Sequence, residues 1–228
     1  MFSYIKSSFK TLTKFELTLW LCSVAASTAS IFVSGTGGIF SAIASVIGAT
    51  CLIFSAKGNV LSQVLSIIFA LMYAAVSFTF RYWGEMITYA CMTLPMAVIS
   101  LISWLRNPYS KTEVKVNVLS KKEICFMFIL TAFVTAVFYF VLAALNTPNL
   151  AVSTVSITTS FLACYLIARR NEFFAIAYAA NDIVLIALWV MASAENPTYI
   201  PMVICFVMFL INDIYSYTSW RKMKLRQM

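Results

Sequence analysis

Long apolar runs, interrupted at short intervals, dominate the pattern of the chain. Eight runs occupy approximately residues 15–34, 38–56, 59–80, 85–105, 123–145, 149–168, 172–193 and 198–219. Breakers such as "SGTGG", "NTPN" and "ENPT" separate them. A helix of about 20 apolar residues crosses the hydrocarbon core of a bilayer. Because the runs do not alternate polar with apolar positions, as barrel strands do, they predict eight transmembrane helices.

Composition supports a membrane location. Hydrophobic residues make up 62% of the chain, charged residues 11%, and the mean hydropathy is +0.90. A soluble domain has about 25% charged residues. The expected class is therefore an all-α integral membrane protein. The first ten residues, "MFSYIKSSFK", form a short basic stretch that leads into a full-length span, so they do not resemble a cleaved signal peptide.

The basic residues are distributed unevenly between the two predicted sides of the membrane. With eight spans, fifteen of the sixteen Lys and Arg residues lie on one side, and Arg81 alone lies on the other. Short cytoplasmic loops collect Lys and Arg during insertion, so both termini are expected on the cytoplasmic side of the membrane. The net charge of +8 follows from this topology and from attraction to anionic lipid headgroups. No nucleic-acid partner is expected.

The metal-binding and redox residue types are few and scattered. The six cysteines fall in six different spans without a CxxC spacing, and the chain has no His. We therefore expect the cysteines to serve as small packing residues, with no metal site and no cofactor.

The chain contains a weak internal repeat. "TKFELTLW" from Thr13 resembles "SKKEICFM" from Ser120, "AKGN" from Ala56 resembles "RRNE" from Arg169, and "ISWLRN" from Ile102 resembles "TSWRKM" from Thr218, at offsets of 107, 113 and 116. Four spans per repeat is an even number, so both copies enter the membrane in the same direction. A long basic linker, residues 106–122, separates the copies. This pattern predicts two parallel bundles around a central cavity.

Polar and aromatic side chains inside the spans are candidates for lining that cavity, and they are confined to the third and fourth spans of each copy. An ionisable group near the middle of a bilayer costs at least about 2.5 kcal/mol, so it usually faces a cavity or a partner. The candidate ligand-binding residues are Gln63, Tyr73, Tyr89, Asn181, Trp189, Asn212, Asp213 and Tyr215.

The most specific of these predictions concern two Asn-Asp pairs, Asn181-Asp182 and Asn212-Asp213. Asn181 lies eight residues before Trp189 and shares its helix face, so Asn181 is expected to contact ligand and Asp182 to support a neighbouring helix. The pattern does not choose between Asn212 and Asp213. The alternative reading is that both Asp residues only lock helices together.

The remaining tryptophans are expected in the interfacial aromatic belts. These are Trp20, Trp83, Trp104 and Trp220.

Two other functional classes are disfavoured. An enzyme would need a catalytic constellation, yet the chain contains neither HExxH nor GxSxG. An ion channel would need rings of carboxylate or carbonyl groups, which only oligomerisation could supply. The pattern favours a carrier.

One stretch resembles a known family. "FRYWGEMITYACMTLPMAVISLISWLRN", with its Tyr-x-Trp-Gly-Glu opening, Tyr89, Pro95 and Trp104, is similar to the PnuC family of nicotinamide riboside transporters, and "RRNEFFAIAYAANDIVLIALW" agrees with it. The resemblance covers about residues 38–222. The chain departs from the family pattern at Met96, where Gln often follows the Pro, and at Phe173 and Phe174, where Trp is frequent.

The resemblance implies a SWEET-like arrangement of three helices, one connecting helix and three more, with the first span as an extra N-terminal helix. The corresponding segments are 1–37, 38–106, 107–148 and 149–228. It also implies facilitated diffusion of nicotinamide riboside, trapping by a cytoplasmic kinase, and a homo-oligomer. Thiamine or riboflavin is the alternative cargo, and proton coupling through Asp182 or Asp213 is the alternative mechanism.

Overall fold

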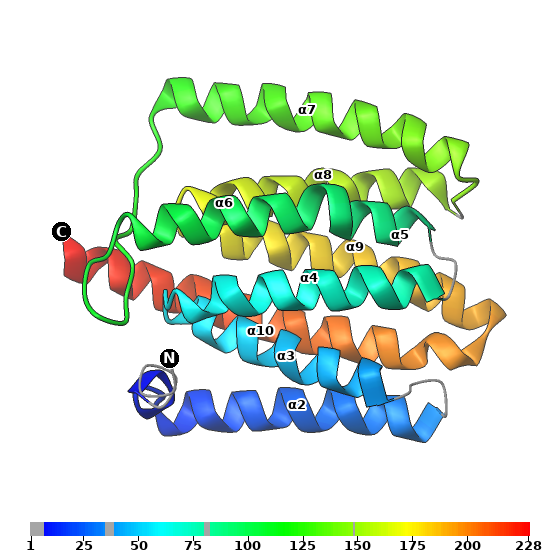
Figure 1. The fold of residues 1–228 in the computed structure, drawn as a ribbon, viewed down its shortest axis with the longest axis horizontal. Helices are drawn as coiled ribbons and strands as arrows, with labels where there is room; N and C mark the ends of the chain where they lie inside the picture. Colours follow the sequence, from blue (N-terminus) through cyan, green and yellow to red (C-terminus); the bar gives the residue numbers. More distant parts are fainter. Residues whose placement is uncertain (1–6, 35–38, 80–82, 148) are drawn as a thin grey trace.

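The computed structural model describes residues 7–34, 39–79, 83–147 and 149–228, and it is almost entirely helical (Figure 1). The long helices are α2 (Lys14–Ser34), α3 (Ile39–Ala56), α4 (Leu61–Thr79), α7 (Lys121–Ala144), α8 (Leu150–Ala168), α9 (Phe174–Glu195) and α10 (Ile200–Gln227). One further rod joins α5 (Trp83–Thr88), a π-helical turn η1 (Tyr89–Thr93) and α6 (Leu94–Leu105). A 3₁₀ turn, η2 (Pro197–Tyr199), precedes α10. A helix therefore occupies each predicted apolar run.

Five of these helices are long and apolar enough to cross a membrane. They are Trp83–Leu105, Lys121–Ala144, Leu150–Ala168, Phe174–Glu195 and Ile200–Gln227. Two shorter apolar helices, Ala42–Ala56 and Leu61–Ala75, accompany them. No β-strand occurs in the described ranges, where an isolated bridge pairs Pro108 with Val114. The all-α membrane class is confirmed.

The π-helical turn in the α5–α6 rod has a local cause. Proline lacks an N–H group and clashes with the carbonyl of the residue four positions before it. Pro95 opens α6, and the Leu94 N–H group donates to the Tyr89 carbonyl five residues back. Widening the turn before Pro95 lets the rod continue through the proline. π-Turns often mark functional sites, and this one places Tyr89 at its first position.

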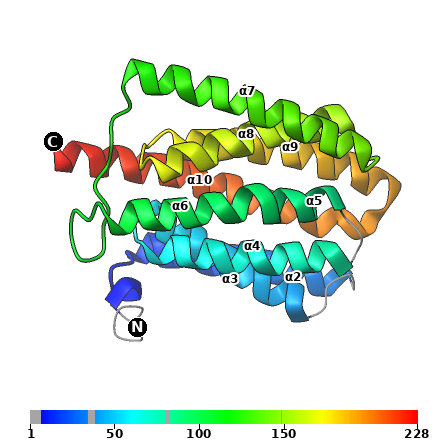
Figure 2. The same ribbon diagram turned by 45° about the horizontal axis from the view of Figure 1, so that its top comes forward.

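The helices contact one another in two similar groups. In one group α3 contacts α4, and α4 contacts α6; in the other, α8 contacts α9, and α9 contacts α10. The groups meet where α3 contacts α10 and where α6 contacts α8. Helix α7 packs against α8 at one edge of the molecule, and α2 packs against α3 and α10 at the opposite edge (Figures 1 and 2).

The turns after α3 and α8 have the same backbone conformation. Gly58 and Arg170 both adopt a left-handed φ, of 61° and 56°. The next residue, Asn59 or Asn171, donates its N–H group to the carbonyl of Phe54 or Leu166, at 3.0 Å in both turns. These equivalent residues lie 112 positions apart, so the sequence alignment of "AKGN" with "RRNE" is wrong by one residue. The error arose because Arg170 stands where the first copy has Gly.

Two tryptophans predicted for the interfacial belts are instead completely buried. Trp104 and Trp220 have no exposed surface and belong to a core cluster with Val114, Phe174 and Met223. The prediction was wrong because each indole N–H group finds an acceptor on a helix end inside the protein and does not need the membrane interface. Trp20 is partly buried and donates to Thr50 Oγ1 at 3.0 Å.

The linker between α6 and α7 crosses both turns. The Val114 N–H group donates to the Gly58 carbonyl and the Asn117 N–H group to the Arg170 carbonyl, each at 2.9 Å. Gln227, at the end of α10, accepts from the Val116 N–H group at 2.7 Å. The linker, both described ends of the chain and the core cluster therefore gather at one end of the molecule (Figure 1).

Candidate functional site: a cavity between the two helix groups

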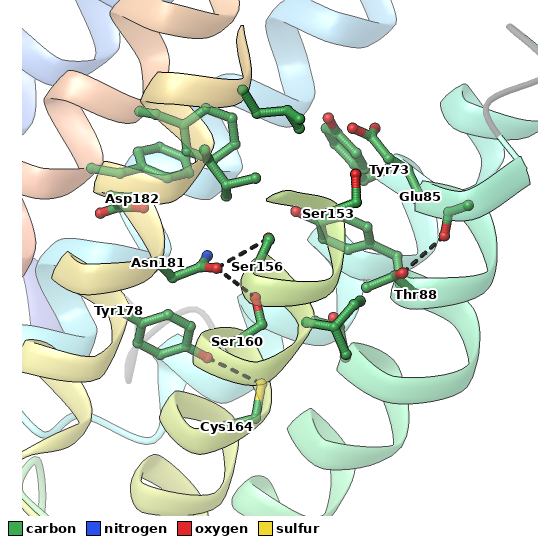
Figure 3. Close-up of a pocket in the computed structure, with 18 of the residues that line it drawn as sticks. Tyr73, Glu85, Thr88, Ser153, Ser156, Ser160, Cys164, Tyr178, Asn181 and Asp182 are labelled. Atoms are coloured by element: carbon green, nitrogen blue, oxygen red, sulfur yellow. Dashed lines mark hydrogen bonds between the residues drawn. The ribbon is translucent and has the colours of Figure 1, made fainter. Parts of the chain in front are cut away.

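A cavity of about 830 Å³ lies between the two helix groups (Figure 3). It receives side chains from α3, α4, the α5–α6 rod, α8, α9 and α10. At one end it reaches the connections at Asn146 and Asn196. At the other it stops at Ser55, Ile167 and Phe174, beside the buried tryptophans. The cavity therefore reaches the end away from the chain termini and is closed at the end that carries them.

Most of the predicted site residues line this cavity. They are Gln63, Tyr73, Tyr89, Asn181, Trp189 and Asp213, together with Asp182. These residues come from four separate segments of the chain. The sequence indicated them only by their polar or aromatic character and their position along each helix. Their contact with a ligand remains a prediction.

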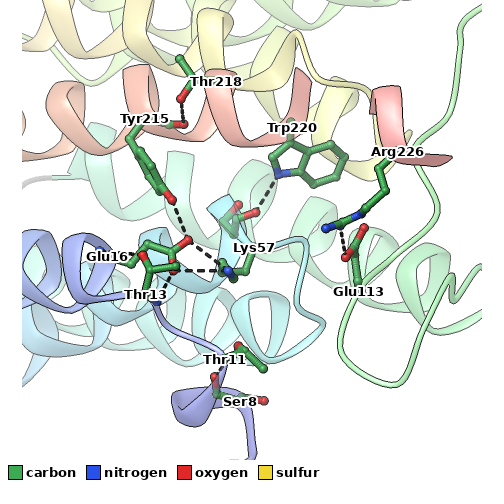
Figure 4. A network of polar contacts seen from close by, with 11 residues as sticks. Ser8, Thr11, Thr13, Glu16, Lys57, Glu113, Tyr215, Thr218, Trp220 and Arg226 are labelled. Atoms are coloured by element: carbon green, nitrogen blue, oxygen red, sulfur yellow. Dashed lines mark hydrogen bonds and ion pairs between the residues drawn. The ribbon is translucent and has the colours of Figure 1, made fainter. Parts of the chain in front are cut away.

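Asn212 and Tyr215 are placed elsewhere, which corrects the expectation that they face the cavity. The Asn212 side-chain amide donates to Ser23 Oγ at 2.8 Å and to the Met208 carbonyl at 2.7 Å. The Tyr215 hydroxyl donates to Glu16 Oε1 at 2.6 Å (Figure 4). Successive helical residues turn by about 100°, so Asp213 faces the cavity while Asn212 and Tyr215 face α2. Of Asn212 and Asp213, between which the sequence did not choose, Asp213 is the one that lines the cavity.

The side-chain amide oxygen of Asn181 is held by hydrogen bonds from α8. Its Oδ1 accepts hydrogen bonds from the hydroxyls of Ser156, Thr159 and Ser160 on α8, at 3.2, 2.8 and 3.0 Å. Among the described residues no acceptor contacts its Nδ2, so the two N–H groups remain available to a ligand. The three hydroxyls on α8 were not predicted, although their spacing of three to four residues places them on one helix face.

Asp182 and Asp213 connect α9 to α10 through their carboxyl groups, which hydrogen-bond to each other. Such a bond requires a proton on one of the two, so the pair carries at most one negative charge. Asp182 Oδ2 is buried without a hydrogen-bond partner in the described part of the chain. Asp182 lines the cavity and lies beside Asp213 of α10. Its support of the neighbouring helix remains a prediction.

Aromatic rings stand at two places in the cavity wall. The rings of Tyr73 and Tyr89 lie 4.4 Å apart between centroids, tilted by 38°. The Trp189 ring packs against Tyr199 at 5.4 Å, and the buried Trp189 Nε1 has no hydrogen-bond partner in the described residues. Buried polar atoms are normally paired, so an unpaired donor in a cavity wall is available to a ligand.

Glu85 is a cavity residue that the sequence reasoning missed. It lines the cavity, and its carboxyl group lies beside the Tyr73 hydroxyl. Glu85 belongs to the Tyr-x-Trp-Gly-Glu stretch, which contributes to the family resemblance but did not by itself indicate a binding residue. A carboxylate at the start of an apolar run was the signal that could have found it.

The eight acidic residues of the chain divide into two sets of four. Glu16, Glu113, Glu123 and Glu172 form ion pairs with Lys57, Arg226, Arg169 and Lys224 at the end that carries the termini (Figure 4 shows two of these pairs). The other four line the cavity: Glu85, Asp182, Glu195 and Asp213. Among the described residues, none of this second set pairs with a Lys or Arg, and no Lys or Arg lines the cavity. Arg81 lies outside the described residues.

The cavity chemistry suits an organic molecule better than a metal ion. No group of three or more Cys, Asp or Glu residues in the described ranges could hold a metal. Carboxyl groups, amide donors, hydroxyls and aromatic faces together can bind a flat, polar cation.

Comparisons with known proteins agree on one family. Residues 38–222 match the family described as nicotinamide mononucleotide transporter. The nicotinamide riboside transporter PnuC of Neisseria mucosa is 28% identical over 221 residues, which cover 94% of this chain and 83% of that protein. The PnuC of Haemophilus influenzae is 24% identical over 187 residues, with coverages of 81% and 80%. These matches confirm the resemblance seen in the sequence.

A solved structure matches the whole fold. The crystal structure of the vitamin B3 transporter PnuC superposes with a TM-score of 0.84 at 25% identity, over 100% of both chains. The matching proteins are transporters, which confirms the expectation of a transporter and not an enzyme.

Proposed function

The chain belongs to the nicotinamide mononucleotide transporter family, and we propose that its cargo is nicotinamide riboside, the NAD precursor named for its relatives. The protein would carry this nucleoside across a bacterial plasma membrane. The cavity between the helix groups would be its binding site.

One observation supports the riboside over the mononucleotide. The cavity holds four carboxyl groups and, among the described residues, no Lys or Arg. Nicotinamide riboside carries a positive pyridinium ring and no phosphate. The mononucleotide adds a phosphate group, which binding sites usually meet with Arg, Lys or helix N-termini. Carboxyl groups would repel the phosphate and attract the pyridinium.

The individual groups suit the parts of the nucleoside. Tyr73, Tyr89 and Trp189 offer aromatic faces to the ring. The free N–H groups of Asn181 can meet the oxygen of the carboxamide or a ribose hydroxyl, and Gln63 offers both a donor and an acceptor. Thiamine is the second candidate because it also contains an aromatic cation; riboflavin, whose ring is neutral, fits this cavity less well.

The architecture we propose is two three-helix bundles joined by α7, with α2 as an extra helix outside them. The contacts among six of the helices support it: exchanging α3 with α8, α4 with α9 and α6 with α10 leaves the set of contacts among these six unchanged. Parallel repeats related by an axis along the membrane normal have this property. The bundles would correspond to residues 38–106 and 149–228, with 1–37 and 107–148 as the extra helix and the connection.

The transport mechanism we propose is facilitated diffusion with both termini in the cytoplasm. The cavity would then open to the outside in this conformation, and a cytoplasmic kinase would trap the arriving substrate. The chain would function as a homo-oligomer in a lipid bilayer. Reporter fusions at the two termini test the orientation, since signals from opposite faces would contradict it.

Ligand-induced thermal stabilisation of the purified protein tests the cargo. Nicotinamide riboside should raise the unfolding temperature, because a ligand that binds only the folded state stabilises it in proportion to its concentration over Kd. Nicotinamide mononucleotide and riboflavin serve as comparison ligands. A larger shift with the mononucleotide than with the riboside would contradict the proposal. Uptake into liposomes should be saturable, which distinguishes a carrier from a channel.

A further inference from the structure

Glu85 differs from the other three carboxyl groups of the cavity. Asp182 and Asp213 lie next to each other, so each carboxyl group has the other as its neighbour. Glu195 is exposed at the mouth. Glu85 lines the cavity, and its carboxyl group lies beside a neutral hydroxyl, that of Tyr73 (Figure 3). A hydroxyl donor orients a carboxylate but leaves its charge uncompensated.

The backbone holds Glu85 in this position. A Cβ atom added to Gly84 would lie 3.0 Å from Thr147 Oγ1 and 3.1 Å from Leu142 Cδ2. A larger residue at this position would require Thr147 or Leu142 to shift, so Gly84 favours the close approach of α5 to α7 and to the α7–α8 connection. Glu85 and Tyr89 are four residues apart, so they share one face of the rod. That face meets α4 at Tyr73.

The groups around Glu85 form a surface for a flat cation. The Tyr73 and Tyr89 rings are 4.4 Å apart, and Phe69 packs against them at 5.6 and 6.1 Å. Aromatic faces attract cations through the ring quadrupole, and the attraction grows when the cation is partly desolvated. An ionised carboxylate beside such rings adds an opposite charge, and no described Lys or Arg in the cavity competes for it.

We propose that Glu85 selects the positively charged form of the substrate ring. In this arrangement the pyridinium lies against the rings of Tyr73 and Tyr89, with the Glu85 carboxylate as its counter-charge. Tyr73 is then also a positioning residue, because its hydroxyl orients the carboxylate. An uncharged ring of the same shape would bind poorly. The inference rests on the proposed function and adds the basis of its selectivity.

The reduced, dihydropyridine form of nicotinamide riboside provides the test, because it keeps the carboxamide and the ribose but has no ring charge. Calorimetric titration of the purified protein should show at least a tenfold preference for the cationic form. Glu85→Gln, which has nearly the same shape, should weaken binding of the cationic form at least tenfold, about 1.4 kcal/mol. It should change binding of the reduced form less than twofold. Tyr73→Phe should reduce the preference less than Glu85→Gln does.

Glu123→Gln is the matched control. Glu123 pairs with Arg169 outside the cavity, so the same chemical change there should leave both affinities unchanged. Equal weakening of both ring forms by Glu85→Gln would overturn the inference, because it would show a role in shape or hydrogen bonding and not in charge selection.

The wild-type ratio decides the question even if Glu85→Gln does not fold. Wild-type protein that binds the two forms equally would contradict the inference about Glu85 alone. Wild-type protein that binds neither form would contradict the proposed function itself.

Discussion

Trp104 and Trp220 each donate a hydrogen bond to a helix of the other helix group. Trp104 Nε1 on α6 donates to the Ile167 carbonyl near the end of α8, at 2.9 Å. Trp220 Nε1 on α10 donates to the Ser55 carbonyl near the end of α3, at 2.8 Å. The two rings are in contact, 5.7 Å apart between centroids. Together they close the cavity at the end that carries the termini.

Removing either indole N–H group should destabilise the protein by a similar amount. Trp104→Phe or Trp220→Phe removes one of the two hydrogen bonds that the Ile167 or Ser55 carbonyl accepts and leaves space around a fully buried side chain, which together should cost about 1 to 3 kcal/mol of the free energy of unfolding. Denaturant titration in detergent micelles would measure it. Trp83→Phe is the control, because Trp83 is 39% exposed and surface substitutions usually change stability by less than about 0.5 kcal/mol. A negligible effect of both core substitutions would contradict a role of these two tryptophans in closing the cavity.

Asn181 and Trp189 should contribute to ligand affinity. Asn181→Ala or Trp189→Ala is expected to weaken binding of nicotinamide riboside by about 1 to 3 kcal/mol, since each removes a donor that a ligand would use. Asn212→Ala is a matched control, because Asn212 bonds to Ser23 outside the cavity. It should lower stability and leave affinity nearly unchanged. If Asn181→Ala and Trp189→Ala both bind as the parent does, the ligand lies elsewhere.

Asp182 should matter more for stability than for affinity. Asp182→Ala would remove the partner of the buried Asp213 carboxyl, and an unpaired buried polar group is costly. Asp182→Asn can still donate a hydrogen bond to Asp213, so it should express and unfold much as the parent does. Expression yield and thermal unfolding in detergent measure the difference. Equal stability of the Ala and Asn variants would count against an inter-helix role.

Transport should not respond to an imposed proton or sodium gradient. The chain has no His, and the described cavity wall has no Lys or Arg to form a proton relay of the kind that driven carriers use. Uptake into proteoliposomes with and without each gradient is the measurement. Accumulation of unmodified substrate against its own gradient would contradict facilitated diffusion and would direct attention to the Asp182–Asp213 pair.

The sequence predicted the long helices, and most of the candidate residues it indicated line the cavity; its failures have physical causes. Long apolar runs located the long helices, because a span must satisfy its own backbone hydrogen bonds in the membrane. It did not fix helix rotation at Asn212 and Asp213, where adjacent polar residues face different neighbours. Trp104 and Trp220 were misplaced because their acceptors come from helices distant in the sequence. Glu85 was missed because its partner, Tyr73, lies on another helix.

The linker makes the two halves unequal even where their helices correspond. The same segment of the linker donates the Val114 N–H group to the Gly58 turn and the Asn117 N–H group to the Arg170 turn, so a single segment binds two equivalent turns. A symmetric pair of identical half-proteins would have two such segments competing for that position, or none. The linker is thus a structural part of the protein as well as a connection. The two halves can be co-expressed as residues 1–106 and 121–228, or with residues 107–120 retained on either half. We expect the complex without residues 107–120 to be less stable. Equal thermal stability of the two complexes would contradict this expectation.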